Sequence, residues 1–209
     1  ARFITTNPAR TGYSAIADEW VPIKPGTDGA LLLALVHEII RLGLYDREFL
    51  ARYTNAGQLV NQDAASDDFG LMLRNTEGDV VNPLRPHNFY WWDRHNAKPV
   101  PDHADGSDPS LFGNYSMPDG TPVKPAFQLL EERVRNCTPE WAEKITGIAA
   151  ATIRRLAHEM GVTARDQTIE LPIAWTDWWG KEHKSVKGNP VAFHAMRGLA
   201  AHSNGFQSI

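Results

Sequence analysis

The sequence predicts an α/β protein with a layered αβα architecture that is interrupted by a long, loop-rich insertion. Two runs of β-branched, aromatic and apolar residues, at 2–6 and within 15–23, each lead into a proline-containing turn, as is typical of strand ends. The segment 30–42 is apolar around most of a helical circumference, which indicates a helix packed on a sheet. The segment 58–124 is dense in Gly, Pro, Asp and Asn, and long loops of this kind usually bind ligands or pack between domains.

The first two helices have ends that the sequence marks. Asp28 is expected to be the N-cap of the helix 30–42, and Gly43 is expected to stop it. Asp46 is expected to open a shorter helix that ends near Tyr53.

Helices return after the insertion. Thr138 and Pro139 supply an N-cap and a first-turn proline, and Gly147 supplies the stop of the same helix. The other expected elements are a helix at 125–136, a helix at 150–160 that stops at Gly161, a β-like run at 168–173 and a weak helix at 190–201.

Two loops are the best candidates for a ligand site. Residues 7–11 and 25–29 each follow an expected strand, and the second loop opens the apolar helix. In open α/β sheets nucleotides bind beyond the strand ends, where helix N-termini face anionic groups and loop carboxylates accept hydrogen bonds from the ribose or base. These loops are therefore candidates for the nucleotide site of a Rossmann-like dinucleotide-binding domain, in which Asp28 could serve a guanine or a ribose. The alternative is that Asp28 is only a helix cap and Pro25-Gly26 only a turn.

We expect four parts along the chain. They are an α/β part at 1–57 that carries the two candidate loops, the loop-rich insertion at 58–124, the helical and strand remainder of the first domain at 125–188, and the start of a next domain at 189–209. The first residue is not Met and lies close to a strand-like run, so we expect an excerpt of a longer protein.

Composition excludes several classes of site. The formal net charge of -4, with Lys and Arg scattered along the chain, makes nucleic acid an unexpected partner. The longest apolar run, 30–36, is far shorter than the roughly 20 residues that cross a bilayer. The lone cysteine, Cys137, excludes an internal disulfide, a Cys-x-x-Cys zinc site and a cysteine-ligated iron–sulfur cluster within these residues, and we interpret it as structural.

Three further sets of residues are weaker candidates for a functional site. The tryptophans Trp91–Trp92 and Trp175 with Trp178–Trp179 could line a substrate funnel, but such groups more often pack between domains. Asp177 and His183 could form half of a catalytic dyad, but no Gly-x-Ser-x-Gly elbow accompanies them. The histidines show no zinc-protease spacing.

Short motifs in a fixed order extend over nearly the whole chain and are weakest in the insertion. They are Asn7-Pro8-x-Arg10-Thr11, Ala17-Asp18, Ile23-x-Pro25-Gly26-Thr27-Asp28, Leu44-Tyr45-Asp46-x-Glu48-Phe49, Thr138-Pro139-Glu140-Trp141-Ala142, Ile145-Thr146-Gly147-Ile148, Ile153-Arg154-Arg155-Leu156-Ala157 and His202-Ser203-Asn204-Gly205. In this order and spacing they resemble the catalytic subunits of the molybdopterin oxidoreductase family, in the dimethyl sulfoxide reductase superfamily.

The resemblance implies a molybdenum or tungsten centre held by two molybdopterin guanine dinucleotides, with a 4Fe-4S cluster bound upstream of these residues. It places one guanosine end of the cofactor on the two strand-end loops. The first loop of the family usually reads Asp-Pro-Arg, whereas here Asn7 replaces the acid and Ala9 replaces the arginine. The cofactor-binding positions that match are Asn7, Pro8, Arg10 and Thr11 in the first loop, and Gly26, Thr27 and Asp28 in the second.

Near the other end, the resemblance assigns Arg197 and His202 to the segment that returns toward the metal, with Asn204 and Gly205 beside the inner pterin. An arginine and a histidine there could clamp an oxyanion substrate and pass protons. The alternative is that Arg197 pairs with a surface carboxylate and His202 caps a helix. No metal ligand is expected within these residues.

The resemblance further implies an enzyme that oxidises or reduces a small oxyanion. The segments 11–20 and 189–198 are most similar to the sulfite dehydrogenase type of sulfur oxidation. A formate dehydrogenase, a thiosulfate or polysulfide reductase, and a metal-free nucleotide-binding or structural module remain as alternatives. Expected partners are an iron–sulfur electron-transfer subunit with a membrane anchor subunit, and the compartment, bacterial cytoplasm or periplasm, stays open.

Overall fold

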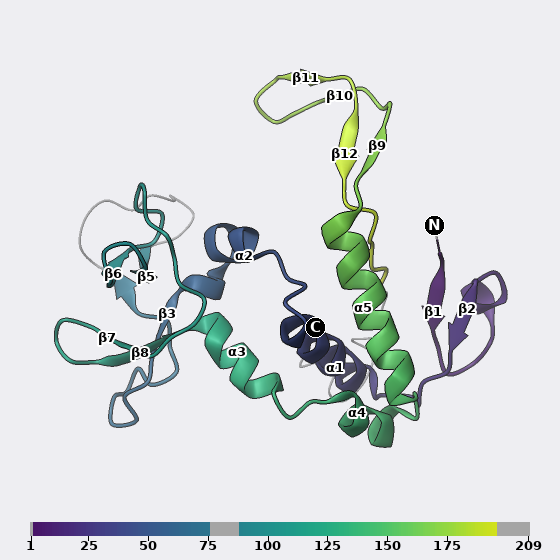
Figure 1. The fold of residues 1–209 in the computed structure, drawn as a ribbon, viewed down its shortest axis with the longest axis horizontal. Helices are drawn as coiled ribbons and strands as arrows, with labels where there is room; N and C mark the ends of the chain where they lie inside the picture. The colour runs from purple at the N-terminus through teal and green to yellow at the C-terminus, as the bar shows by residue number, and fades with distance from the viewer. Residues whose placement is uncertain (1, 76–87, 196–209) are drawn as a thin grey trace. The chain divides into compact units, whose positions relative to one another are not determined.

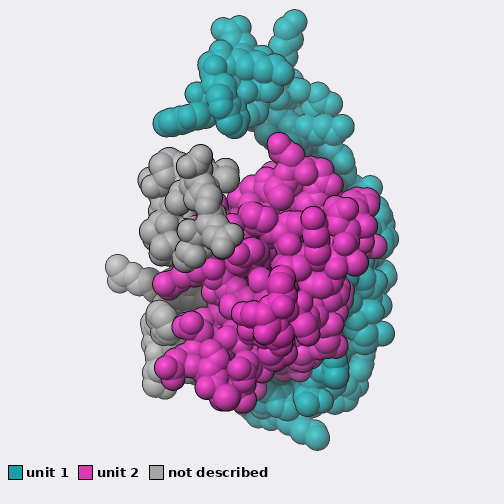
Figure 2. Space-filling model, turned by 90° about the vertical axis from the view of Figure 1, so that its left-hand side faces the viewer, with its two compact units in different colours: residues 1–45, 134–209 teal, residues 46–133 magenta. Residues whose placement is uncertain are grey.

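The computed structural model describes residues 2–75 and 88–195, and they form helices and short strands (Figure 1). Strands follow one another between residues 59 and 125, and helices follow one another between residues 126 and 166. The chain is therefore of the mixed α/β type. It divides into two compact units, one made of the described parts of 1–45 and 134–209 and the other of 46–133 (Figure 2). None of the described helices is both long enough and apolar enough to cross a membrane.

The first unit is built on three helices and one pair of parallel strands. Strand β1 (Ile4–Thr6) pairs with β2 (Glu19–Val21). Helix α1 (Asp28–Arg41) packs against α4 (Pro139–Thr146) and α5 (Ala150–Asp166). The buried core of this unit consists of Val21, Ile23, Leu31, Ala34, Leu35, Ala142, Ile148, Ile153, Leu156 and Ala157.

An ion-pair cluster ties the strand pair to the longest helix. Glu19 on β2 pairs with Arg155 on α5, and it also accepts a hydrogen bond of 2.5 Å from Arg2. Arg155 reaches Glu159, one turn further along α5, at 3.0 Å. These groups are partly exposed, so we expect each pair to add well under about 1 kcal/mol while fixing the orientation of β2 on the helix.

The first unit also carries two small antiparallel ladders after α5. Strand β9 (Ile169–Leu171) pairs with β12 (Val186–Gly188), and β10 (Trp175–Thr176) pairs with β11 (Glu182–His183). Residues 190–195 have no helical structure, so the described part of the weak helix expected at 190–201 is absent.

The second unit is antiparallel. It begins with α2 (Arg47–Tyr53) and ends with α3 (Ala126–Val134). Its two sheets have the strand orders β3-β8-β7 and β4-β5-β6. The strands are β3 (Leu59–Asn61), β4 (Arg74–Asn75), β5 (Asn88–Asp93), β6 (Lys98–Pro101), β7 (Tyr115–Ser116) and β8 (Pro122–Pro125). The insertion is therefore richer in strands than its composition predicts.

Several helix ends lie where the sequence predicts them. Asp46 accepts a hydrogen bond from the Phe49 backbone N–H and caps α2. Thr138 accepts from Trp141 and caps α4, and Gly147 ends that helix in the left-handed region with φ of 78°. Gly43 follows α1 with φ of 63°.

The expected end of α5 at Gly161 is wrong, because the helix continues through this residue to Asp166. A Cβ atom at position 161 would lie 2.7 Å from the Cβ and Cδ1 atoms of Leu44. The glycine therefore permits a close approach between α5 and Leu44, which follows α1. This tertiary contact is not part of a rule that reads helix ends from the local sequence.

Candidate functional site

The two candidate loops leave neighbouring strands at the same edge. Strands β1 and β2 run parallel with Thr6 opposite Val21, so the residues that follow each strand begin side by side (Figure 1). The backbone N–H of Asn7 donates to the Val21 carbonyl at 3.3 Å and extends this pairing into the first loop. The indole N–H of Trp20 donates to the Asn7 carbonyl at 2.8 Å. The start of the first loop is thus held by the second strand.

The first loop, 7–11, is shaped by its own amide side chain. The Oδ1 atom of Asn7 accepts a hydrogen bond of 3.1 Å from the Ala9 backbone N–H, and the Ala9 carbonyl accepts from the Thr11 N–H at 2.9 Å. Thr11 then precedes a 3-10 helix, Gly12–Ala15. Asn7 therefore performs the turn-forming role that asparagine and aspartate share, which makes it a physically reasonable replacement for an acid at this position.

The second loop ends in the N-terminus of α1, and here the sequence expectation is corrected. Thr27, not Asp28, occupies the N-cap position, and Asp28 is the first residue of the helix. The Thr27 hydroxyl donates to the Lys24 carbonyl at 2.6 Å and closes the loop. Gly26 between them has φ of 75°, a conformation that favours glycine. Asp28 thus carries its negative charge in the first helical turn, where the helix dipole stabilises anions.

The second loop is held in place by the C-terminal end of α4. The Lys24 backbone N–H donates to the Thr146 carbonyl at 3.0 Å. The Lys24 side chain runs past Gly147, where a Cβ would meet its Cε atom at 3.4 Å. This lysine and Trp20 support the loops, and sequence reasoning gave neither of them a role. Lys24 lies directly before the second loop and Trp20 lies within β2, and these positions are the only local signals that mark them.

The loop surface carries groups that suit a polar ligand. Arg10 and Thr11 are exposed, and Arg10 forms no ion pair within the described residues. A Cβ added at Gly26 would meet no atom within 4 Å, so the backbone there is open to a close approach. On β1, the hydroxyl of Thr5 is buried and has no hydrogen-bond partner among the described residues. This edge therefore offers a cation, amides, hydroxyls and a carboxylate to a ligand.

The remaining sequence candidates for the site lie near the C-terminus. Arg197, His202, Asn204 and Gly205 lie outside the part of the chain that the structure describes. Within that part, no three His, Cys, Asp or Glu side chains gather in a way that could hold a metal ion. Cys137 is partly buried in the link between α3 and α4, where its backbone N–H donates to Val134.

The tryptophans divide into two kinds. Trp91 is 3% exposed, and Trp92 stacks on Tyr115 with ring centroids 4.1 Å apart, so both pack inside the second unit. Trp178 and Trp179, in contrast, are 93% and 87% exposed.

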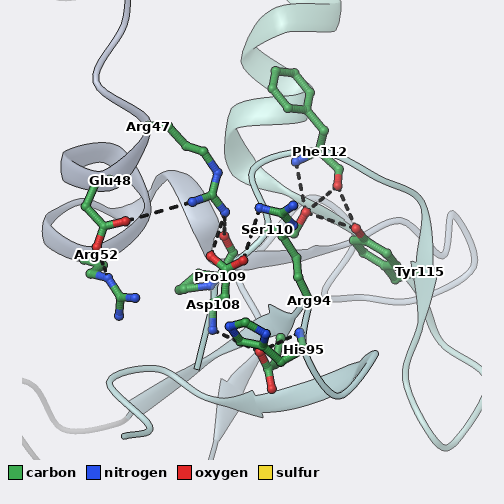
Figure 3. A network of polar contacts seen from close by, with 11 residues as sticks. Arg47, Glu48, Arg52, Arg94, His95, Asp108, Pro109, Ser110, Phe112 and Tyr115 are labelled. Atoms are coloured by element: carbon green, nitrogen blue, oxygen red, sulfur yellow. Dashed lines mark hydrogen bonds and ion pairs between the residues drawn. The ribbon is translucent and has the colours of Figure 1, made fainter. Parts of the chain in front are cut away.

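A second polar cluster lies in the second unit and supports its fold. Asp108 pairs with Arg47 at 2.8 Å and with Arg94 at 3.1 Å (Figure 3). Burial of Asp108 disfavours its charge, but the hydrogen bond from Arg47 and the charge of Arg94 outweigh this and lower its pKa. Tyr115 and Ser110 continue the network through a hydrogen bond of 3.0 Å.

Beneath this cluster, Asp93 is 1% exposed and organises the turn after β5. Its carboxylate accepts hydrogen bonds from the backbone N–H of Asp108 at 2.9 Å and of His95 at 3.2 Å, and from the Asn96 side chain at 2.5 Å. The bond from Asp108 is the largest of the effects that lower the pKa of Asp93, and it overcomes the opposing effect of burial. All these partners are structural, so we assign the cluster to stability.

We expect Asp93→Asn to lower the stability of the second unit at neutral pH only. Because the folded-state pKa of Asp93 is lowered, its charge stabilises the fold above the ordinary aspartate value of about 4, and this contribution is lost as the pH falls through the folded-state pKa. At pH 7 the variant should lose about 1–2 kcal/mol, or roughly tenfold in amide protection of 88–111. Near pH 3 the difference from the parent should shrink toward zero.

Hydrogen exchange of the full-length protein, compared with the parent at each pH, measures this. Asp105→Asn is the matched control, because Asp105 is exposed. A loss of protection that is equal at both pH values would show that the amide acts by shape and not through the missing charge.

No protein-family model matches the chain. The chain is 66% identical over 208 residues to a subunit of the sulfite dehydrogenase of Allochromatium vinosum, an alignment that covers 100% of this chain and 22% of that protein. It is 34% identical over 203 residues to the alpha subunit of the perchlorate reductase of Dechloromonas aromatica, which covers 80% of this chain and 21% of that protein. The molybdopterin-containing ArrA subunit of the arsenate respiratory reductase of Chrysiogenes arsenatis is 27% identical over 206 residues, 97% of this chain and 18% of that one. The chain thus spans about a fifth of the length of these relatives.

Proposed function

Because the chain belongs to the molybdopterin oxidoreductase family, we propose that it forms part of the catalytic subunit of a molybdenum oxidoreductase and binds one guanosine end of a molybdopterin guanine dinucleotide. The observation that carries this proposal is the parallel pair β1 and β2, whose following loops start together and lead into the N-terminus of α1. In α/β proteins this arrangement is where nucleotides bind. The finer architecture that we propose is the layered, Rossmann-like domain.

The residues at this edge fit a guanosine. The Asp28 carboxylate can accept hydrogen bonds from the guanine amino and imino groups, or from ribose hydroxyls, in the first turn of α1. The exposed guanidinium of Arg10 can pair with a phosphate, and the backbone at Gly26 leaves room for a flat or bulky group to approach. The amide nitrogen of Asn7 stays available because its oxygen serves Ala9. Pro8, Thr11 and Thr27 complete the proposed contact set by shaping the loops.

The bound cofactor would supply the oxygen-atom or hydride chemistry at its metal, and this chain's contribution would be to hold and orient it. The metal ligand itself is proposed to lie elsewhere in the subunit. Arg197 and His202 remain the proposed groups for gripping an oxyanion and moving protons, with Asn204 and Gly205 beside the pterin.

Sulfite is the proposed substrate. The relative at 66% identity carries the name sulfite dehydrogenase, whereas the perchlorate and arsenate reductases are 34% and 27% identical. A thiosulfate reductase is the second candidate, since the PhsA subunit of Salmonella typhimurium is 40% identical, though over only 30% of this chain. We further propose an upstream 4Fe-4S cluster, with a partner iron–sulfur subunit plus a membrane anchor subunit to receive the electrons.

The cofactor proposal is tested by metal and nucleotide content. The purified full-length protein, from cells able to make the cofactor, should contain about one molybdenum or tungsten and release about two GMP per chain on acid treatment. Turnover with sulfite and with thiosulfate as the alternative then identifies the substrate. A folded protein with neither metal nor GMP would contradict the proposal and favour a metal-free structural module.

A further inference from the structure

Residues 167–188, which we call the arm, form a ribbon that has no core of its own. The arm consists of the ladders β9 with β12 and β10 with β11, and none of its residues is buried. An isolated two-stranded hairpin is at best marginally stable in water, because it buries too little apolar surface to offset the ordering of its backbone. The arm therefore needs a surface that the described residues do not provide.

The tip of the arm is nevertheless tightly organised. One carboxylate oxygen of Asp177 accepts hydrogen bonds from the backbone N–H groups of Trp179 at 3.0 Å and Lys181 at 2.9 Å, and the other meets His183 at 2.9 Å. The ring of His183 stacks on Trp175 at 4.4 Å, and the Trp175 N–H donates to the Ser185 carbonyl at 3.1 Å. The Asp177–His183 pair thus fixes the shape of a turn.

The ordered tip presents a large apolar surface. Trp178 and Trp179 are 93% and 87% exposed, and Ile173, earlier in the arm, is 53% exposed. Tryptophans buried at an interface contribute more binding energy than most residues, and soluble proteins seldom leave two adjacent ones in water. A turn that is ordered while its two indoles lie in solvent is typical of a docking element.

We propose that the tip of the arm, Trp178 and Trp179, docks into an apolar hollow with an acidic rim, on the part of the same polypeptide that lies outside these 209 residues. The chain spans 22% of the sulfite dehydrogenase subunit that it resembles. In a protein of that length, about four fifths of the residues lie outside this chain and can form the surface that receives the tip. The acidic rim follows from Lys181 and Lys184, which lie next to the tip, form no ion pair within the described residues and outnumber the one unpaired carboxylate beside them, Glu182. A two-fold contact between copies is disfavoured because it would bring these lysines toward their own counterparts.

Hydroxyl-radical footprinting of the purified full-length subunit tests the proposal directly. Trp178 and Trp179 should be oxidised about tenfold more slowly than in the same protein unfolded in urea, and this protection should persist on dilution. Oxidation at the unfolded rate would show a free tip. Protection that disappears on dilution would indicate a second copy, and protection that requires another protein to be added would indicate a separate chain. Each of these three results would overturn the intramolecular assignment.

Trypsin gives a second readout, since the arm carries lysines next to its tip. In the full-length subunit, the double variant Trp178→Ala, Trp179→Ala should be cleaved after Lys181 and Lys184 about tenfold faster than the parent, and the matching pair of phenylalanine substitutions only about twofold faster. Phe69→Ala, which removes another exposed aromatic side chain from a loop of the second unit, should leave this rate unchanged.

Equal cleavage of the parent and the alanine pair would contradict docking. Docking of the arm depends on the length of the relative and on no property of the cofactor. Metal and GMP content of the same preparations therefore tests cofactor binding independently of docking.

Discussion

Replacing Asp28 by alanine in the full-length protein is expected to lower the metal and GMP content per folded chain while leaving the fold intact. Asp28 lies in the first turn of α1 and not at its N-cap position, so the substitution costs the helix the dipole interaction of a first-turn carboxylate, about 0.3–1 kcal/mol. Loss of hydrogen bonds between a carboxylate and guanosine would weaken that contact by about 1.5–3 kcal/mol, or roughly 10- to 100-fold. We therefore expect the substitution to weaken ligand binding more than it destabilises the fold.

The chain offers a matched control at the start of the next helix. Asp46 is a true N-cap, because its carboxylate accepts the Phe49 backbone N–H at 2.9 Å. Asp46→Ala should cost α2 about 0.5–2 kcal/mol and leave metal and GMP content at the parent level. Full content in a folded Asp28→Ala protein would exclude the guanosine contact, and equal losses in both variants would show a general effect of stability.

The parts of the fold that the sequence predicts well are those that depend on neighbours in the chain. The caps at Asp46 and Thr138 and the left-handed end at Gly147 each follow from the side chain or backbone freedom of one residue. The pairing of Leu59 with Pro125 across the insertion depends on residues far apart, and its short strands are hidden in a composition that is typical of loops.

The candidate site divides in the same way. Both loops could be located because strand-like runs precede them and an apolar helix follows. The bond from the Trp20 indole to the Asn7 carbonyl and the anchoring of Lys24 on Thr146 are tertiary contacts, so no local pattern predicts them. The misassigned cap is a local error of one residue: both Thr27 and Asp28 are good capping types, and the structure places Thr27 before the first helical turn.

Gly161→Ala is expected to destabilise the first unit, although alanine favours helices by about 1 kcal/mol over glycine. Position 161 lies inside α5, and the added methyl group would sit 2.7 Å from the Cβ and Cδ1 atoms of Leu44, well inside contact distance. Overpacking of this kind costs about 1–3 kcal/mol or more. We therefore expect a net loss of stability that appears as faster hydrogen exchange of the α5 amides in the full-length protein.

Gly188→Ala is the matched control, since a Cβ there meets no atom within 4 Å. Truncating the neighbour in Leu44→Ala should relieve part of the clash, so Gly161→Ala should cost less in that background than in the parent. If Gly161→Ala instead slows exchange along α5, helix propensity outweighs the contact, and the glycine is not required for the approach of α5 to Leu44.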